Sequence, residues 1–410
     1  MSQLSKIRFA AVILASIAIS CSGLAQAESF ALTNAHVFDG VTNEIHAGRT
    51  VFVKDGKIER IEASTNSIAS EYTVIDAEGN YLMPGMFDAH THISTLEQAQ
   101  RALESGITTI RTGSVSAYQD VAMRELVKSG QLPGPDVAAA GVFVTPDLGR
   151  TVLADPRLKA LYGGVNTDDE LRMLVNINVD RGVDVIKTRG TQRAGLPDTD
   201  PRQQVYTEHQ LRVVVEEAAR HGIPVMVHAH GDEGARAAVL AGARSIEHGT
   251  YLSDETLRLM KERGTWMVPT YVTMDEMNEE QYGYVLRLRG KHMVPQLERA
   301  IRAAHAMGVK IATGADNYYD EESINRISIE IEHFVRMGMT NFEALQTATT
   351  SSADLLQIGD QTGRIAPGYE ADMILVPANP LINIEALQDV LLVMSNGQLA
   401  LKRIPFGVKE

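Results

Sequence analysis

Cysteine is almost missing from this chain, since the only one among its 410 residues is Cys21. Without a second cysteine the chain forms no internal disulfide, and beyond Cys21 it offers no thiolate ligand to a metal. Basic residues are also in short supply, with 38 Lys and Arg against 52 Asp and Glu and a formal net charge of -14. This balance argues against a nucleic-acid groove or an anionic membrane surface as partner.

Long apolar runs are absent beyond the first residues, so we expect no transmembrane segment there. At the start, Lys6 and Arg8 precede the apolar run FAAVILASIAIS, and AQA at 25–27 is a small-x-small cleavage site. This pattern predicts a secretory signal over residues 1–27 and export to the periplasm or the medium. Lipoprotein processing at Cys21 is the weaker alternative, because AISC lacks the large aliphatic residue usual three positions before the cysteine.

The two ends of the remaining chain share one pattern. Residues 28–84 contain short alternating segments such as TVFVKDGKIERIEA, separated by turn signals, and residues 363–410 contain similar ones around an NG turn. Neither end shows a long helical period. We therefore predict one small β-sandwich domain built from both chain ends.

Strand-like and helix-like segments alternate between residues 85 and 362. The apolar segments are MFDAHTHI, TTIRTGS, DVAAAGV, DVIKTRG, PVMVHAH, SIEHG, WMVPTYV and KIATGAD. Between them lie helical patterns, the clearest being TEHQLRVVVEEAARHG, with Thr207 as a cap and Gly222 as a stop. Eight such units predict an α/β fold, the (β/α)8 TIM barrel; a doubly wound open sheet is the alternative, because alternation does not reveal strand order.

Polar residues gather at the ends of these strand-like segments, where the active site of such a barrel lies. They are His90, His92, Lys187, His228, His230, His248 and Asp316. Residues two apart in a strand face the same way, so both histidines of HTH can point into one site. Histidine and carboxylate groups without cysteine suit zinc, with manganese, nickel or iron as alternatives.

Lys187 ends an apolar run, where a charged ammonium is disfavoured. An uncharged lysine amine can react with carbon dioxide to form a carbamate, whose two oxygens can bridge two metals. Each residue alone has a simpler explanation: a core histidine pair at HTH, a solvent-reaching Lys187, or Asp316 as a helix cap. Their shared place at one end of several strands favours a metal site.

These segments together resemble the amidohydrolase superfamily over essentially the whole chain after residue 27. The likeness begins at YLMPGMFDAHTHI, continues through IKTRG, VHAHGDEGARAAVLAGARSIEHG and TGAD, and ends at GRIAPGYEADMILV. Within the superfamily the chain looks most like exported binuclear dipeptidases of the Xaa-Pro and Xaa-Arg/Lys kind and ochratoxin-cleaving amidases. The resemblance implies two metals per chain. His90, His92 and Asp316 would hold the more buried one, and His228 and His248 the more exposed one.

The resemblance also implies that carboxylated Lys187 and a hydroxide bridge the two metals. His230 would then lie near the substrate and stabilise the tetrahedral oxyanion, while Asp316 would act as general acid and base. Asn317 departs from the pattern, because related enzymes often carry a small residue after the aspartate. This change alters the pocket but does not remove the base.

The predicted function is hydrolysis of C–N bonds in dipeptides or N-acyl amino acids. A substrate carboxylate needs a cation, and Arg189 and Arg193 are candidates in the loop after the lysine strand, with Tyr206 as a further contact or a core residue. An acidic stretch over 275–280 either attracts a basic side chain or is solvated. The alternatives are a lactonase or cyclic-amide hydrolase, an imidazolonepropionase-like enzyme, and an exported binding protein or inactive relative. A homo-oligomer is possible.

Overall fold

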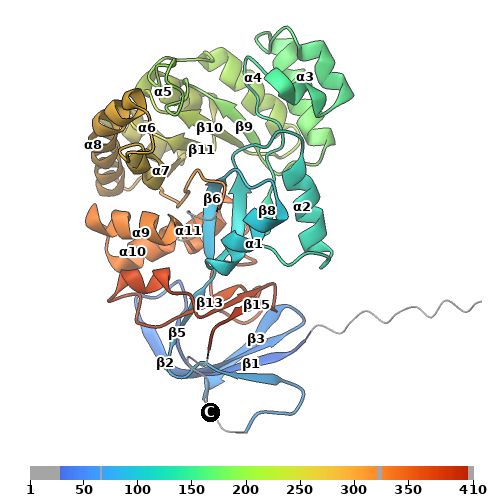
Figure 1. The fold of residues 1–410 in the computed structure, drawn as a ribbon, viewed down its shortest axis with the longest axis vertical. Helices are drawn as coiled ribbons and strands as arrows, with labels where there is room; N and C mark the ends of the chain where they lie inside the picture. Colours follow the sequence, from blue (N-terminus) through green and yellow to red (C-terminus); the bar gives the residue numbers. More distant parts are fainter. Residues whose placement is uncertain (1–27, 65–66, 321–325, 405–410) are drawn as a thin grey trace, which may run out of the picture.

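The structure, a computed structural model, describes residues 28–64, 67–320 and 326–404. In Figure 1 the strands from the two chain ends lie together at the bottom, below a body of helices and further strands. The predicted secretory signal at 1–27 lies outside the described residues. Within the described ranges, no helix is long and apolar enough to cross a membrane.

One mixed sheet of eight strands joins the two chain ends, in the order β15-β14-β13-β5-β1-β2-β3 with β4 also paired to β1. Its strands are β1 Phe30–Phe38, β2 Ile45–Lys54, β3 Lys57–Ala63, β4 Thr73–Asp76, β5 Tyr81–Pro84, β13 Met373–Val376, β14 Leu392–Ser395 and β15 Gln398–Lys402. The antiparallel pairing of β5 with β13 connects the ends, from Tyr81 opposite Val376 to Pro84 opposite Met373.

The predicted β sandwich is not confirmed, because these pairings join all eight strands into one sheet. Strand β1 is long enough to pair with β4 along its first half and with β5 along its second half, while β2 takes its other edge. Apolar residues of both chain ends, such as Leu32 and Leu375, share one buried cluster. The domain boundaries at 28–84, 85–362 and 363–410 stay a prediction.

Seven further strands are parallel and form two sheets. The first contains β6 Met86–Thr91, β7 Ile107–Thr112 and β8 Asp136–Ala138, and the second β9 Ile186–Arg189, β10 Val225–Ala229, β11 Ser245–His248 and β12 Trp266–Val268. Nearly all their residues are buried, as expected for parallel strands covered by helices.

Isolated bridges link these two sheets at both edges. The bridges are Val144–Thr188, Met267–Ile311 and Asn317–Thr91. The regular ladders form two open sheets. The bridge at Val144 connects the chain after β8 to β9, and the other two bridges connect β12 to residues 310–317 and these residues to the end of β6. The order of neighbours therefore follows the predicted (β/α)8 succession.

The predicted eighth strand, KIATGAD at 310–316, is not a regular strand in the structure. It still bonds to β6, since Ala89 N donates to Thr313 O at 3.0 Å and Asp316 N to His90 O at 2.7 Å. The close approach depends on Gly314, where an added Cβ would lie 2.5 Å from Val268 Cγ1.

Helices separate the parallel strands and cover them. They are α1 Leu96–Glu104, α2 Gln119–Lys128, α3 Asp168–Asp180, α4 Glu208–Ala219, α5 Asp232–Ala241, α6 Asp254–Arg263, α7 Tyr271–Glu276, α8 Tyr284–Met307, α9 Arg326–Arg336, α10 Asn341–Thr347 and α11 Thr350–Leu355, with 3-10 turns η1 Gly149–Leu153, η2 Pro156–Leu161 and η4 Ile384–Gln388. The predicted cap of α4 is confirmed: Thr207 Oγ1 accepts from Gln210 N, and Gln210 Oε1 accepts from Thr207 N.

Candidate active site

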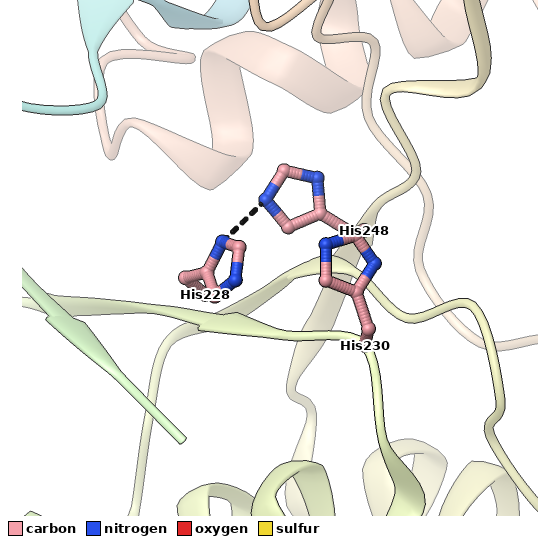
Figure 2. A group of neighbouring side chains, drawn as sticks. All are labelled: His228, His230 and His248. Atoms are coloured by element: carbon pink, nitrogen blue, oxygen red, sulfur yellow. Dashed lines mark hydrogen bonds between the residues drawn. The ribbon is translucent and has the colours of Figure 1, made fainter. Parts of the chain in front are cut away.

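The carboxyl ends of the parallel strands bring the predicted polar residues to one place. His90 lies on β6, Lys187 on β9, His228 on β10 and His248 on β11. Asp316 lies in the segment 310–317, which contacts β12 and β6. Parallel neighbours end at the same edge of a sheet, so side chains distant in sequence meet there. Figure 2 shows the part of this cluster formed by His228, His230 and His248.

His90 is oriented by a buried carboxylate. Its Nδ1 lies 2.7 Å from Glu247 Oε2, which only accepts, so Nδ1 carries the proton and Nε2 keeps its lone pair. That lone pair faces Lys187 Nζ at 3.1 Å and Asp316 Oδ1 at 3.5 Å. Burial lowers the pKa of His90 to about 4, so the ring is neutral, as a metal ligand must be.

Glu247 in turn is paired with Arg111 of β7. The Arg111 guanidinium contacts both carboxylate oxygens at 3.0 and 3.1 Å, and its Nε donates to Ala89 O at 2.7 Å. Burial raises the pKa of Glu247, but the charge of Arg111 and the bond to His90 outweigh it and bring the pKa to about 2. A permanently charged carboxylate therefore stands behind His90.

His92 is oriented by a backbone carbonyl where His90 is oriented by a carboxylate. Its Nδ1 donates to Ser114 O at 2.9 Å, and its Nε2 lies 3.0 Å from Asp316 Oδ1. His90 is almost completely buried, whereas the His92 side chain is 22% exposed and stacks on Tyr318. Alternation along the strand thus brings both histidines to Asp316, at different depths.

His228 and His248 face each other. His228 Nε2 donates to Gln192 O at 3.1 Å, which leaves Nδ1 bare and 2.8 Å from His248 Nε2 (Figure 2). His248 Nδ1 is paired with Thr270 Oγ1 at 2.7 Å, which leaves Nε2 for this contact. Burial holds the pKa of both histidines well below the ordinary value, so both rings are neutral, and His248 Nε2 donates to His228 Nδ1 when it carries the single proton of its ring.

These contacts test whether the site fits a metal ion. The Nε2 atoms of His92 and His90 lie 3.0 and 3.5 Å from Asp316 Oδ1, and His228 Nδ1 lies 2.8 Å from His248 Nε2, so ligand atoms from different strands converge at two points. The four rings are each held from behind by an acceptor or a hydroxyl, which is how metal-binding histidines are oriented. His90, His248 and Asp316 also place one ligand atom each within 4.8 Å of one another. The donor set fits a divalent metal such as zinc.

His230 belongs to the same cluster but is held differently. Its Nδ1 contacts Thr250 Oγ1 at 2.9 Å, and its ring stacks on His248 with centroids 4.5 Å apart. Its backbone N donates to Thr191 Oγ1 at 2.9 Å. His230 lines the cavity beside His228, so the structure brings together all seven predicted polar residues.

Two of these residues have left-handed backbones. His248 has φ 74° and Asp316 has φ 50°, in a region that residues other than glycine seldom adopt. Because the backbone turns at His248, the neighbouring side chains of Glu247 and His248 both approach His90. The ring centroids of His90 and His248 are 5.2 Å apart. Such strain is typical of functional sites, where the surrounding structure enforces it.

Lys187 is buried with its amine inside this cluster. Burial lowers the pKa of the lysine to about 8, although the carboxylates of Glu247 and Asp316 oppose this. Its Nζ lies 3.1 Å from His90 Nε2, and Phe143 covers one side at 5.8 Å from the ring centroid. At pH 7 such a pKa leaves roughly a tenth of the amine neutral, far more than for an ordinary lysine.

A cavity of about 1480 Å³ opens above the cluster. Arg189 and Arg193 line it on one side, with their guanidinium carbons 4.6 and 5.6 Å from the centroid of Phe143. Arg189 Nε has no hydrogen-bond partner among the described residues, and burial lowers the pKa of Arg189 to about 10. An anion arriving here would satisfy a guanidinium that the chain leaves unpaired.

Tyr206 does not line this cavity. It is one of the largest fully buried side chains, and its hydroxyl donates to Val165 O at 2.7 Å. Tyr206 is therefore a core residue, which was one of its two predicted roles. Its predicted contact with substrate is not supported. Of the acidic stretch, Glu276 and Glu279 line the cavity, and Glu276 pairs with Arg326 at 2.9 Å.

Sequence reasoning missed the residues that orient the ligands. Glu247 stands beside His248 in the motif SIEHG, and a lone acid in a buried strand was the available signal. Asp88 lies in β6, two residues before His90. Its carboxylate accepts from His90 N and Ala315 N at 3.0 Å and from Tyr319 Oη at 2.8 Å. It fastens the segment before Asp316 to β6.

Comparisons with known proteins identify relatives of this chain. Ochratoxinase from Aspergillus niger is 28% identical over 357 residues, covering 75% of this chain and 72% of the relative. A solved Xaa-Pro dipeptidase with bound methionine in the active site is similar at 27% identity and TM-score 0.83, covering 91% of this chain and 99% of the other. A solved amidohydrolase is similar at 28% identity and TM-score 0.79, covering 92% and 100%. The sequence pattern of the amidohydrolase family matches residues 81–400, and the chain belongs to that family.

Proposed function

We propose that this chain is a metal-dependent amide hydrolase that acts on dipeptides or N-acyl amino acids. The observation that carries the proposal is the convergence of four oriented imidazole rings, those of His90, His92, His228 and His248, at one end of a large cavity. Similarity to a Xaa-Pro dipeptidase and to ochratoxinase supports amide cleavage.

The ligands fall into two groups. His90 and His92 converge with Asp316, while His228 and His248 converge with each other. We assign one metal to each group, with zinc as the first choice because neutral imidazole and carboxylate ligands suit it. When bound, the metals would activate water and polarise the substrate carbonyl.

Lys187 would join the two groups as a carbamate. Its neutral Nζ would form a bond to the carbon of carbon dioxide and lose one proton, which leaves a singly negative group with two oxygens. Burial and the lowered pKa of about 8 support a neutral amine for this step. Lys187→Ala is expected to lose bound metal and activity, with partial rescue of both by a small added carboxylate. Full metal content and activity in Lys187→Ala would show that no bridge is needed.

The chain's own residues would move the proton and hold the substrate. Asp316 Oδ1 is within 3.0 to 3.5 Å of His92 and His90 and points into the cavity floor, where it would accept a proton and return it to the leaving amine. His230, beside His228, would hold the developing oxyanion. Arg189 and Arg193 would bind the carboxylate of the substrate's terminal residue, since their guanidinium groups flank Phe143 in the cavity wall.

The decisive experiment measures release of free amino acid from a panel of dipeptides and N-acyl amino acids by zinc-loaded protein. Each substrate is paired with the same compound bearing a C-terminal carboxamide, and Asp316→Asn protein serves as the contamination control. Release from the acids, with much weaker release from the carboxamides, is the expected result. No release from any member, with metal measured in the protein, would contradict amide cleavage and direct the search to lactones and cyclic amides.

A further inference from the structure

The loop between β9 and α4, residues 190–207, forms one wall of the cavity. It contains only one isolated bridge, Thr191–Gln204, yet Gln192, Arg193 and Leu196 from it line the cavity. Internal bonds shape it, as when Asp200 N donates to Gln192 Oε1 at 2.9 Å. A loop of this length with so little regular structure needs an external support to keep a fixed position.

Near the ends of the loop, Thr191 Oγ1 accepts from His230 N and Tyr206 Oη donates to Val165 O, and α8 supports the middle of the loop. The Arg289 guanidinium donates hydrogen bonds from both terminal nitrogens to four carbonyl oxygens of the loop. Its Nη1 donates to Ala194 O and, at 2.8 Å, to Leu196 O, while its Nη2 donates to Pro197 O at 3.3 Å and Thr199 O at 2.6 Å. A lysine has three donors on a single atom and cannot reproduce this planar fork.

The clamped loop affects the site at two points. Gln192 O accepts from His228 Nε2 at 3.1 Å, and this bond turns His228 Nδ1 toward His248. The next residue, Arg193, places its guanidinium 5.6 Å from the Phe143 ring centroid on the cavity wall. One displacement of the loop would therefore disturb both a metal ligand and a substrate contact.

We propose that Arg289 is a positioning residue that holds the 190–207 loop over the cavity and thereby orients His228 and Arg193. The inference rests on the proposed function for its kinetic consequences, but its structural consequences can be measured without turnover. Arg289 is absent from the cavity lining, and its four hydrogen bonds to the loop all go to backbone oxygens. It acts through the loop, not on substrate.

The test compares Arg289→Met and Arg289→Lys with Arg302→Met. Arg302 is a matched control, because it lies on the same helix and donates to two carbonyls, Met337 O and Arg336 O, away from the cavity. In zinc-loaded protein, hydrogen exchange of the amides at 192–203 is expected to accelerate at least about tenfold in Arg289→Met and less in Arg289→Lys. Zinc release to a chelator is expected to accelerate about 10- to 100-fold, as for other lost ligand-orienting contacts.

Kinetics separate positioning from general damage. KM for a substrate with a free carboxylate should rise about tenfold in Arg289→Met, whereas the matching carboxamide should change little. Equal loop exchange and zinc release in Arg289→Met, Arg302→Met and the unchanged protein would overturn the proposal. If Arg289→Met does not fold, Arg289→Lys decides by the same readouts. If the unchanged protein cleaves no amide, the proposed function fails, while exchange and zinc release still decide the role of Arg289.

Discussion

Glu247 orients one of the proposed metal ligands from a position outside the cavity lining. Its carboxylate accepts from His90 Nδ1 and from Arg111, and all three side chains are buried. The charge of Arg111 is thereby compensated, and the proton of His90 is kept on the nitrogen away from the cavity. Removing the negative charge would remove both effects at once.

Glu247→Gln is therefore expected to weaken zinc binding about 10- to 100-fold, because His90 loses its carboxylate partner. It should also lower the free energy of unfolding by about 3–5 kcal/mol, because Arg111 is left without its buried counter-charge. Zinc competition with a chelator and denaturant unfolding measure the two effects. Glu330→Gln is the control, since Glu330 is equally buried but bonds to the backbone N of Tyr271 and Val272. An unchanged zinc affinity in Glu247→Gln would contradict the assigned role.

Asp316→Asn tests the proton transfer. The amide keeps the shape of the side chain but cannot accept a proton at neutral pH, so kcat should fall by at least about 10²- to 10⁴-fold. His90, His92 and Lys187 remain, so we expect the variant to keep most of its metal. Amino acid release and elemental analysis of the same sample measure the two properties. Substantial turnover with the metal present would exclude Asp316 as the base.

The clustering of the candidate ligand residues could be predicted from the sequence, while their hydrogen-bond partners could not. His90 and His92, two apart in a strand, and Lys187 at the end of an apolar run carry local signals that survive without coordinates. Gln192 and Ser114 act through backbone carbonyls, which every residue possesses, so their side chains reveal nothing. Local sequence patterns identify candidate ligand side chains, but not the distant groups that hydrogen-bond to them in the fold.

Elements with strong end signals were predictable. Helix α4 begins after its predicted cap at Thr207, because a cap depends on residues close in sequence, here Thr207 and Gln210. The eighth strand was predicted from an apolar run, yet residues 310–316 make isolated contacts to β6 and β12. The close packing at Gly314 that shapes this segment depends on Val268 and His90, which no local pattern reveals.

At the same scale, Asp155 joins η2 to the end of α3. Its side chain is 2% exposed, accepts from Arg157 N at 2.9 Å, and pairs with the guanidinium groups of Arg157 and Arg181 at 3.0 and 2.7 Å. The bonds from Arg157, together with Arg181, hold the pKa of Asp155 well below its ordinary value. A depressed carboxyl pKa stabilises the fold above the ordinary pKa of about 3.9, and the effect is lost as the pH falls below it.

Asp155→Asn should therefore lower the free energy of unfolding at pH 7 by about 1–3 kcal/mol, the usual worth of hydrogen bonds to charged groups. The difference between the two proteins should shrink as the pH drops below about 4. Denaturant unfolding between pH 7 and 3 measures it. Asp169→Asn is the matched control, because Asp169 lies in the first turn of α3 with a fully exposed side chain. A difference that persists unchanged at pH 3 would rule out the charge as its source.

Across the whole molecule, alternation along the chain predicted the succession of strands, because consecutive parallel strands usually lie side by side. The sheet from the chain ends was harder, since β5 and β13 pair across nearly 300 residues and spacing carries no information about such partners. One sheet of eight strands results where two were expected. Long-range pairing is therefore the part of this fold that required the structure.

The site draws its ligands from β6, β9, β10, β11 and the segment containing Asp316, so a bound metal would tie both parallel sheets together. An ion that binds the folded chain alone stabilises it by about 4 kcal/mol at a thousand times its Kd. Calorimetry is thus expected to show a higher Tm for zinc-loaded than for chelator-treated protein, with a further rise as free zinc increases. Magnesium should not substitute, because it prefers oxygen ligands. His228→Asn should flatten the dependence on zinc by removing one of the two facing nitrogens. A Tm independent of zinc would mean that these elements meet without an ion between them.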